Sequence, residues 1–141
     1  INRERPDYAY INGTLHGNPM GSVAGLATLA ELRKPGFYDN LHARAGDFLK
    51  GCQDVLDRHR LPALAMGEAS LWQIVFTGRR PDSHASMMEA DFARTRELDT
   101  LCMKEGLYVL PGVRRFVSAV HGEADFEDTW RALDTACRAL L

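Results

Sequence analysis

Two short segments of the chain have residue types and spacing that suit the binding of an anion. The first is the segment 13–19, Gly-Thr-Leu-His-Gly-Asn-Pro, which places a hydroxyl group beside glycine just before the expected start of a helix. A helix N-terminus offers unpaired backbone N–H groups and the positive end of the helix dipole, and both favour a phosphate. An ordinary capped loop explains the same residues, so both interpretations stay open on this pattern alone.

The second segment is the arginine pair Arg114 and Arg115, at the start of an expected short strand. Successive side chains of a strand point to opposite faces, so one arginine should face each side of the sheet. A guanidinium group at a sheet edge is a natural partner for a substrate carboxylate. The alternative is a pair of solvated arginines.

Other kinds of catalytic site find little support in the residue pattern. The five histidines show no metal-ligand spacing, and no Gly-x-Ser-x-Gly sequence is present, so neither a metal site nor a nucleophilic serine is predicted. His42 and His59 are expected on the solvated face of a helix, and His121 is expected to be structural, near the start of the last helix. Three cysteines lie in helical apolar patterns and are predicted to be core residues in a reducing compartment: Cys52, Cys102 and Cys137.

The overall composition predicts a globular domain. The 141 residues are 45% hydrophobic and 26% charged, which suffices for a core, and a net charge of −2 gives no indication of a nucleic-acid partner. No apolar run approaches the ~20 residues that span a bilayer, and the first ten residues lack the pattern of a signal peptide, so we expect no membrane partner and a cytoplasmic location. Because the chain starts at Ile1 without an initiator methionine, we expect a piece of a longer protein.

Hydrophobic periodicity predicts how these residues are positioned. Asn18 should cap a helix over 19–33, whose small residues predict tight packing against another backbone. Further helices are expected over 37–59, over 86–105 with Met88 facing inward, and from 123 onward. Strands are expected over 63–66, 70–77, 107–110 and 115–120. This order predicts an α+β fold, with helices packed on a small, mainly antiparallel sheet.

These residues resemble a known family. Residues 13–20, together with Val-Ala-Gly-Leu-Ala-Thr-Leu at 23–29, are similar to the segment that follows the cofactor lysine in class III pyridoxal-phosphate-dependent aminotransferases. Pro-Gly-Phe-Tyr at 35–38 continues the resemblance. It extends to residues 70–77, 104–108 and 116–121, the last being similar to the end of the glutamate-1-semialdehyde aminotransferase-like members.

The resemblance implies the small C-terminal domain of a fold type I homodimer that uses pyridoxal 5'-phosphate. It implies that Thr14 donates to the cofactor phosphate of the neighbouring subunit and that Gly13 and Leu15 line the same opening. It also implies that Arg115 binds a substrate carboxylate. On this basis residues 1–18 are the tail of the large cofactor-binding domain, 19–36 a connecting helix and 37–141 the small domain.

The chain also departs from the family. It is shorter than the aminomutases between Pro111 and Phe116 and lacks their Phe-Glu pair, which favours a transaminase acting on an amino or β-amino acid and an oxo-acid. Glutamate-1-semialdehyde 2,1-aminomutase and a non-catalytic binding or dimerisation module are the alternatives.

The lysines give a second departure. The family requires a Schiff-base lysine, yet helix positions explain Lys34, Lys50 and Lys104. We therefore expect the missing large domain to supply this lysine, no catalytic residue in this chain, and no activity from the chain alone.

Overall fold

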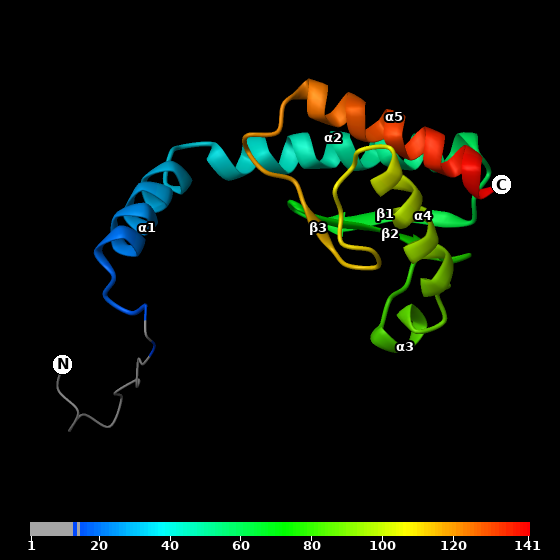
Figure 1. Ribbon diagram of the computed structural model, residues 1–141, viewed down its shortest axis with the longest axis horizontal. Coiled ribbons are helices and arrows are strands. Elements are labelled where there is room, and N and C mark those ends of the chain that lie inside the picture. Colours follow the sequence, from blue (N-terminus) through cyan, green and yellow to red (C-terminus); the bar gives the residue numbers. More distant parts are fainter. Residues whose placement is uncertain (1–12, 14) are drawn as a thin grey trace. The chain divides into compact units, whose positions relative to one another are not determined.

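The computed structural model describes residue 13 and residues 15–141 (Figure 1). The chain divides into two compact units, residues 1–37 and 38–141, and each is described by itself.

The first unit contains the helix α1, Pro19–Leu32, and its start follows the predicted cap. The Asn18 side chain accepts hydrogen bonds from the backbone N–H groups of Met20 and Gly21, at 2.9 Å and 3.3 Å. Proline at the first helical position needs no hydrogen-bond partner there. None of the residues of α1 is buried, so the tight packing predicted for this helix is not seen among the described residues.

The second unit is built around two long amphipathic helices, α2 (Phe37–Arg58) and α5 (Glu123–Leu140). They contact each other through aromatic side chains: the ring of Phe48 stacks on Trp130 at 6.1 Å between centroids. The Trp130 indole N–H donates to the Phe48 carbonyl at 3.1 Å. Gly51 makes this contact possible, because a Cβ atom there would lie 2.4 Å from the indole ring.

The sheet has three antiparallel strands in the order β1 (Ala63–Glu68), β2 (Leu71–Phe76) and β3 (Arg115–Phe116). Trp72, Ile74 and Phe76 alternate along β2 and join the core formed with the helices. The predicted pairing of the first two strands is confirmed, and so is the α+β class with helices packed on a small antiparallel sheet.

The single helix predicted over 86–105 is wrong, because two helices stand in its place. These are α3 (His84–Met87) and α4 (Phe92–Lys104). Asp91 interrupts the helical pattern: its side chain accepts from the N–H of Arg94 at 2.9 Å, and its own N–H donates to Phe76 of β2 at 2.9 Å. Capping by a short acidic side chain competes with helix continuation. Met88, predicted to face inward, is 60% exposed.

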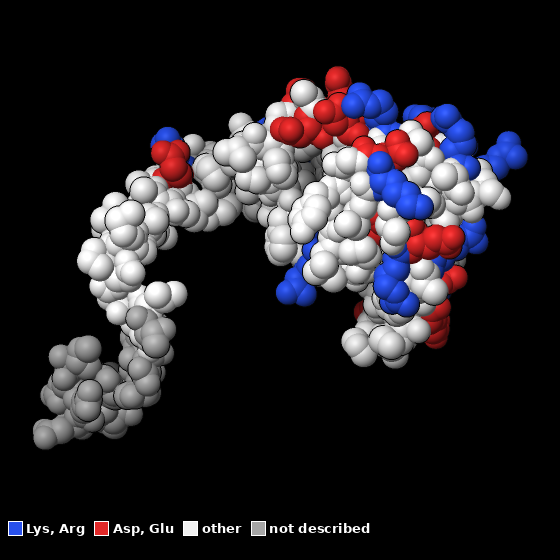
Figure 2. All heavy atoms as spheres, in the orientation of Figure 1, with Lys and Arg blue, Asp and Glu red and all other residues white. Residues whose placement is uncertain are grey.

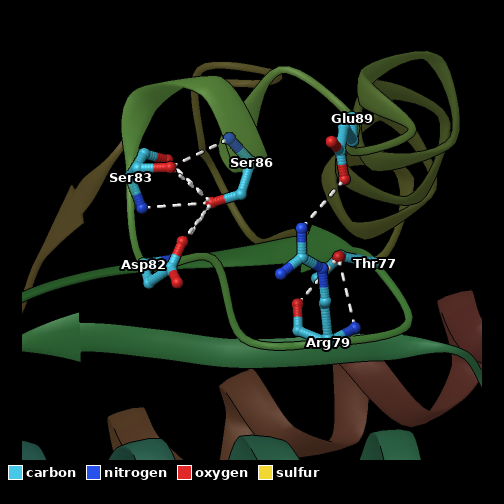
Figure 3. Close-up of polar contacts among 6 residues, drawn as sticks. All are labelled: Thr77, Arg79, Asp82, Ser83, Ser86 and Glu89. Carbon is cyan, nitrogen blue, oxygen red and sulfur yellow. Dashed lines mark hydrogen bonds and ion pairs between the residues drawn. The ribbon is translucent and has the colours of Figure 1, made fainter.

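Hydrogen bonds between serines and an aspartate hold the start of α3 (Figure 3). The Ser86 hydroxyl is buried, accepts from the N–H groups of Asp82 and Ser83 at 3.0 Å each, and donates to the Asp82 carboxylate at 2.9 Å. These hydrogen bonds lower the pKa of Asp82. Because its polar groups are satisfied internally, this cluster is a helix cap rather than a binding site.

Two of the predicted strands are also corrected. Residues 107–110 form no strand, and the strand predicted over 115–120 is reduced to Arg115–Phe116 plus one further bond, from the Val117 N–H to the Ser70 carbonyl at 2.8 Å. The chain then turns, with the His121 N–H donating to the Ser118 carbonyl. A strand requires a partner along its length, and β2 offers one only at its first residues.

His59 was expected in solvent but is half-buried against α5. Its Nε2 atom lies 2.9 Å from the Asp134 carboxylate, which also binds Arg58 at 2.9 Å and Arg138 at 2.7 Å. The pairs of Arg58 and His59 with Asp134 link the end of α2 to α5, whereas the Arg138 pair lies within α5. The side-chain hydrogen bond from His59, followed by the charges around Asp134, lowers the pKa of this carboxyl.

Candidate functional site

The N-terminal loop carries the residues predicted to contact a cofactor phosphate. Gly13 and Leu15 are described and exposed, whereas Thr14 lies outside the described residues. The imidazole of His16 lies over Gly13, where a Cβ atom would meet it at 2.7 Å. The predicted roles of Gly13, Thr14 and Leu15 therefore stay predictions.

The start of α1 corrects one part of the anion-site argument, which assumed unpaired N–H groups. The N–H groups of Met20 and Gly21 bind the Asn18 side chain, Pro19 has none, and that of Ser22 binds the Asn18 carbonyl at 3.0 Å. The cap thus satisfies the first-turn donors that a phosphate would use. A phosphate at this loop would have to bind to the Thr14 hydroxyl and loop amides instead.

Arg115, the predicted substrate-carboxylate ligand, is buried in the second unit with a fixed partner. Its side chain is 9% exposed and forms an ion pair with Asp99 of α4, which is 1% exposed. Its guanidinium carbon also lies 4.8 Å from the centroid of the Trp72 ring. A buried charge is tolerated when it is paired and packed in this way. The predicted substrate contact is not tested by this geometry and stays a prediction.

Asp99 uses both of its oxygens. One accepts from Arg115, and the other accepts from the backbone N–H of Gly112 at 2.7 Å. Asp99 thus binds two points of the segment between α4 and β3. The sequence interpretation missed this residue, although a carboxylate beside Thr95, Leu98 and Cys102 on the inward face of a helix was a detectable signal.

Arg114 has the opposite environment. It is exposed, and it has no hydrogen-bond or ion-pair partner among the described residues. Arg114 lines two hollows of the second unit, of about 620 Å³ and about 650 Å³. The arginine pair predicted from sequence therefore divides into one buried, neutralised member and one free cation.

The first hollow combines aromatic and charged groups. Tyr108 and Phe116 line it and are 93% and 63% exposed, and Arg131 lines it while paired with Asp128 at 2.7 Å. Three acidic residues line the same hollow, Glu105, Asp125 and Asp128, so its lining carries charges of both signs, and Arg114 is the group in it that could bind an anion.

The turn before α5 borders this hollow and is held by its own hydrogen bonds. The ring nitrogen Nδ1 of His121 accepts from the Ser118 N–H at 3.2 Å, and Asp125 accepts from the Gly122 N–H at 2.7 Å. Arg44 of α2 donates to the carbonyls of Ala119 and His121. These contacts agree with the structural role predicted for His121.

The cysteines are unsuited to nucleophilic chemistry. All three are buried and free, as predicted for core residues: Cys52, Cys102 and Cys137. Burial raises the pKa of each thiol to about 12, so the reactive thiolate is not formed near neutral pH. Within residues 13 and 15–141, no group of histidine, cysteine and acidic side chains could hold a metal ion, and no helix is long and apolar enough to cross a membrane.

The three lysines are exposed residues. Lys34 pairs with Glu31 at 2.5 Å on the surface, and Lys50 and Lys104 are exposed. None of the three lines either hollow of the described residues.

Solved structures establish the class of the fold. The chain superposes on an omega-transaminase from Sphaerobacter thermophilus with a TM-score of 0.76 and 23% identity, over 94% of this chain and 30% of that one. A transaminase with PLP bound gives a TM-score of 0.74 and 18% identity over the same shares. The matched residues, 94% of this chain, thus have the fold of one part of a transaminase.

Sequence comparison establishes the family, although no family model matches the chain. The chain is 33% identical over 125 residues to the glutamate-1-semialdehyde 2,1-aminomutase of Polaromonas naphthalenivorans (strain CJ2), covering 87% of this chain and 28% of that protein. It is 32% identical over 127 residues to the enzyme of that name from Nitrosomonas europaea, covering 89% and 29%. The chain belongs to the class III aminotransferase family and corresponds to the C-terminal portion of its members, about 30% of their length.

Proposed function

We propose that the intact protein is a pyridoxal-phosphate-dependent aminotransferase that moves an amino group between an amino acid, or β-amino acid, and an oxo-acid. The family membership supports this proposal, as does the structural likeness to a transaminase that carries the cofactor. The observation in the chain itself is the free guanidinium of Arg114 beside a hollow with exposed aromatic rings. Such a group binds the carboxylate that amino acids and oxo-acids share.

The proposal assigns this chain a binding role. The cofactor supplies the electron sink that makes amino transfer possible, and a lysine outside this chain would bind it covalently. The residues of the second unit would hold the substrate carboxylate and cover one side of the site. Because positions in or beside helices explain its three lysines, we expect the chain alone to be inactive.

The proposal includes a homodimer in the cytoplasm. In it, Gly13, Thr14 and Leu15 border the cofactor phosphate of the neighbouring subunit. Gly13 and Leu15 are exposed and so available for such a contact, and because Asn18 occupies the first amides of α1, the loop residues would have to bind the phosphate.

Glutamate-1-semialdehyde 2,1-aminomutase is the second candidate, because the two sequence relatives reported above carry that name. Against it stands the short segment between Pro111 and Phe116, which lacks the Phe-Glu pair of those enzymes. A non-catalytic binding or dimerisation module is the third candidate.

The full-length protein tests these candidates. We expect it to bind pyridoxal 5'-phosphate, seen as near-visible absorbance, and to convert an amino acid and an oxo-acid in a coupled assay. Conversion of glutamate-1-semialdehyde without any oxo-acid would favour the aminomutase instead. Failure to bind the cofactor would leave the non-catalytic module.

A further inference from the structure

The helix α1 has no polar side that could face water. Its sequence PMGSVAGLATLAEL holds one charged residue, Glu31 near its end, and none of its residues is buried in the described part of the chain. Two of its large apolar side chains, Val23 and Leu26, are 66% and 68% exposed. A surface helix normally keeps a polar stripe, whereas a helix that is apolar all round is enclosed by protein. The composition of α1 therefore requires a cover that the described residues do not provide.

Two opposite sides of α1 differ in the size of their side chains. At about 3.6 residues per turn, one side carries the apolar residues Val23, Leu26 and Ala30. The opposite side carries the small residues Gly21, Ala24, Gly25 and Thr28. Both glycines have open space where a Cβ atom would lie, so another backbone can approach this side closely. The helix thus suits side-chain packing on one side and a close backbone contact on the other.

The polar groups of α1 are compatible with enclosure. The Thr28 hydroxyl donates to the Ala24 carbonyl at 2.9 Å, and the Asn18 side chain accepts from the amides of Met20 and Gly21. Burying a polar group costs little when it already has a hydrogen-bond partner. A cover over α1 would therefore leave these groups satisfied.

A lipid surface does not suit this helix. The 14 residues of α1 rise about 21 Å, which is short of the ~30 Å hydrocarbon core of a bilayer. A helix that lies in the membrane interface carries lysine and arginine on a polar face, and α1 contains neither residue type. The cover that fits α1 is therefore an apolar protein surface.

The length of the relatives indicates where this surface comes from. The chain covers 28% and 29% of the two aminomutases reported above and corresponds to the C-terminal portion of the family. Most of the length of those proteins lies on the N-terminal side of the matching residues, and α1 is the described helix nearest to that side. A partner on the same polypeptide has a high effective concentration, which a separate protein lacks.

We propose that α1 is an internal helix of the intact protein, enclosed by the N-terminal portion of the same polypeptide. An apolar surface of that portion packs against Val23 and Leu26, and a backbone segment of it packs against Gly21 and Gly25. This inference rests on the longer protein of the proposed function but not on its amino transfer, so its tests need no activity.

The first experiment measures how fast a maleimide labels single introduced cysteines in the 141-residue chain and in the full-length protein. Val23→Cys and Ala24→Cys place a thiol on the two sides of α1, and Lys50→Cys, at an exposed position of α2, is the control. The native cysteines of the chain give a low background, because burial raises the pKa of their thiols to about 12.

The expected result is a loss of labelling in the longer protein alone. In the 141-residue chain, Val23→Cys and Ala24→Cys should react as fast as Lys50→Cys. In the full-length protein both should react at least about 100-fold more slowly, because labelling then requires local opening, while Lys50→Cys keeps its rate. Fast labelling of α1 in the full-length protein would overturn the inference, and so would slow labelling in the 141-residue chain.

A cross-link separates the N-terminal portion from a second copy. The photoreactive residue p-benzoylphenylalanine replaces Leu26 in the full-length protein, and the product is separated on a denaturing gel and digested. We expect a product of monomer mass in which residue 26 is joined to a peptide of the N-terminal portion. A product of twice that mass would assign α1 to a contact between copies and contradict the proposal, as would a link to residues 38–141.

A substitution with opposite effects tests the small side of α1. Gly25→Ala should raise the helicity of the 141-residue chain, because alanine is the better helix former. In the full-length protein it should lower the melting temperature by about 2 °C or more, because the methyl group enters a close backbone contact. A melting temperature that is unchanged or raised would exclude this contact.

The outcomes for this inference and for the proposed function are distinguishable. A full-length protein that neither binds pyridoxal 5'-phosphate nor transfers amino groups, but protects Val23→Cys and Ala24→Cys, would refute the function and support the enclosed helix. An active enzyme in which Val23→Cys reacts as fast as Lys50→Cys would refute the enclosed helix alone.

Discussion

The helices α1 and α2 follow each other in the chain but owe their helical structure to different interactions. In α1 no residue is buried and Glu31 is the one charged residue, and Figure 2 shows few charged groups on its visible surface. In α2 an apolar stripe enters the core, and the charged residues lie on the exposed side. Asn18 and Pro19 define where α1 begins, whereas α2 is stabilised mainly by packing of its amphipathic face.

The glycines of the two helices also differ in their surroundings. Gly21 and Gly25 of α1 have open space where a Cβ atom would lie, whereas Gly51 of α2 lies against the Trp130 indole. Glycine therefore has a packing role in α2 and no described contact in α1.

The largest expected effect on stability is that of truncating the buried leucine of α5, compared with an exposed leucine of α1. Leu133 is 1% exposed and Leu26 is 68% exposed. Leu133→Ala should lower the free energy of unfolding of the chain by about 2–5 kcal/mol, because it removes apolar contacts and leaves a cavity. Leu26→Ala should change it by less than about 0.5 kcal/mol. Urea unfolding followed by fluorescence of Trp72 and Trp130 measures both; a large effect of Leu26→Ala would contradict the contrast.

A smaller effect is expected from the glycines. Gly51→Ala should lower the melting temperature, because the added methyl group displaces the Trp130 indole at a cost of about 1–3 kcal/mol. Gly25→Ala should instead stabilise α1 by up to about 1 kcal/mol and so raise its helicity, since alanine is the better helix former. Thermal unfolding and circular dichroism at 222 nm measure the two changes. Equal signs for the two substitutions would contradict the difference between the helices.

The smallest expected effect is the contribution of the Asp134 ion pairs to the pH dependence of stability. The pKa of Asp134 is lowered in the folded state, chiefly by its hydrogen bond from His59. A carboxyl whose folded pKa is lowered contributes stability above its unfolded pKa, near 3.9, and loses that contribution as the pH falls through its folded pKa. Asp134→Asn should therefore reduce stability at pH 6 and flatten the acid side of the stability curve.

The matched control for Asp134 is Glu31→Gln in α1. The Glu31–Lys34 pair is exposed by more than half on both sides, so its loss should have no measurable effect. Urea unfolding between pH 3 and pH 7 gives both curves. An acid transition that is the same in Asp134→Asn and in the unsubstituted chain would contradict the assignment.

Much of the fold could be predicted from the sequence. The cap at Asn18, the helices over α1, α2 and α5, the pairing of β1 with β2 and the burial of the cysteines all follow from local signals. The prediction of one long helix over 86–105 was wrong, because Asp91 satisfies a backbone N–H at the start of α4 and its own N–H binds β2. Apolar periodicity does not report such competition for backbone groups.

The candidate site was predictable only in part. The arginine pair was recognised, but an alternation of faces does not tell which face is buried. Asp99 decided this, because a buried carboxylate on α4 requires a cation, and Arg115 supplies it. The roles of Arg115, Gly13, Thr14 and Leu15 in binding stay predictions.

The sequence by itself determined the family resemblance, the caps and the amphipathic periods, because these depend on residue type and on spacing along the chain. Only the tertiary structure decided that Arg115 is paired, that Arg114 is free, and that Gly51 makes room for Trp130. These features depend on residues far apart in the chain that meet in a dry core, where the loss of water makes every unpaired charge and every added methyl group costly.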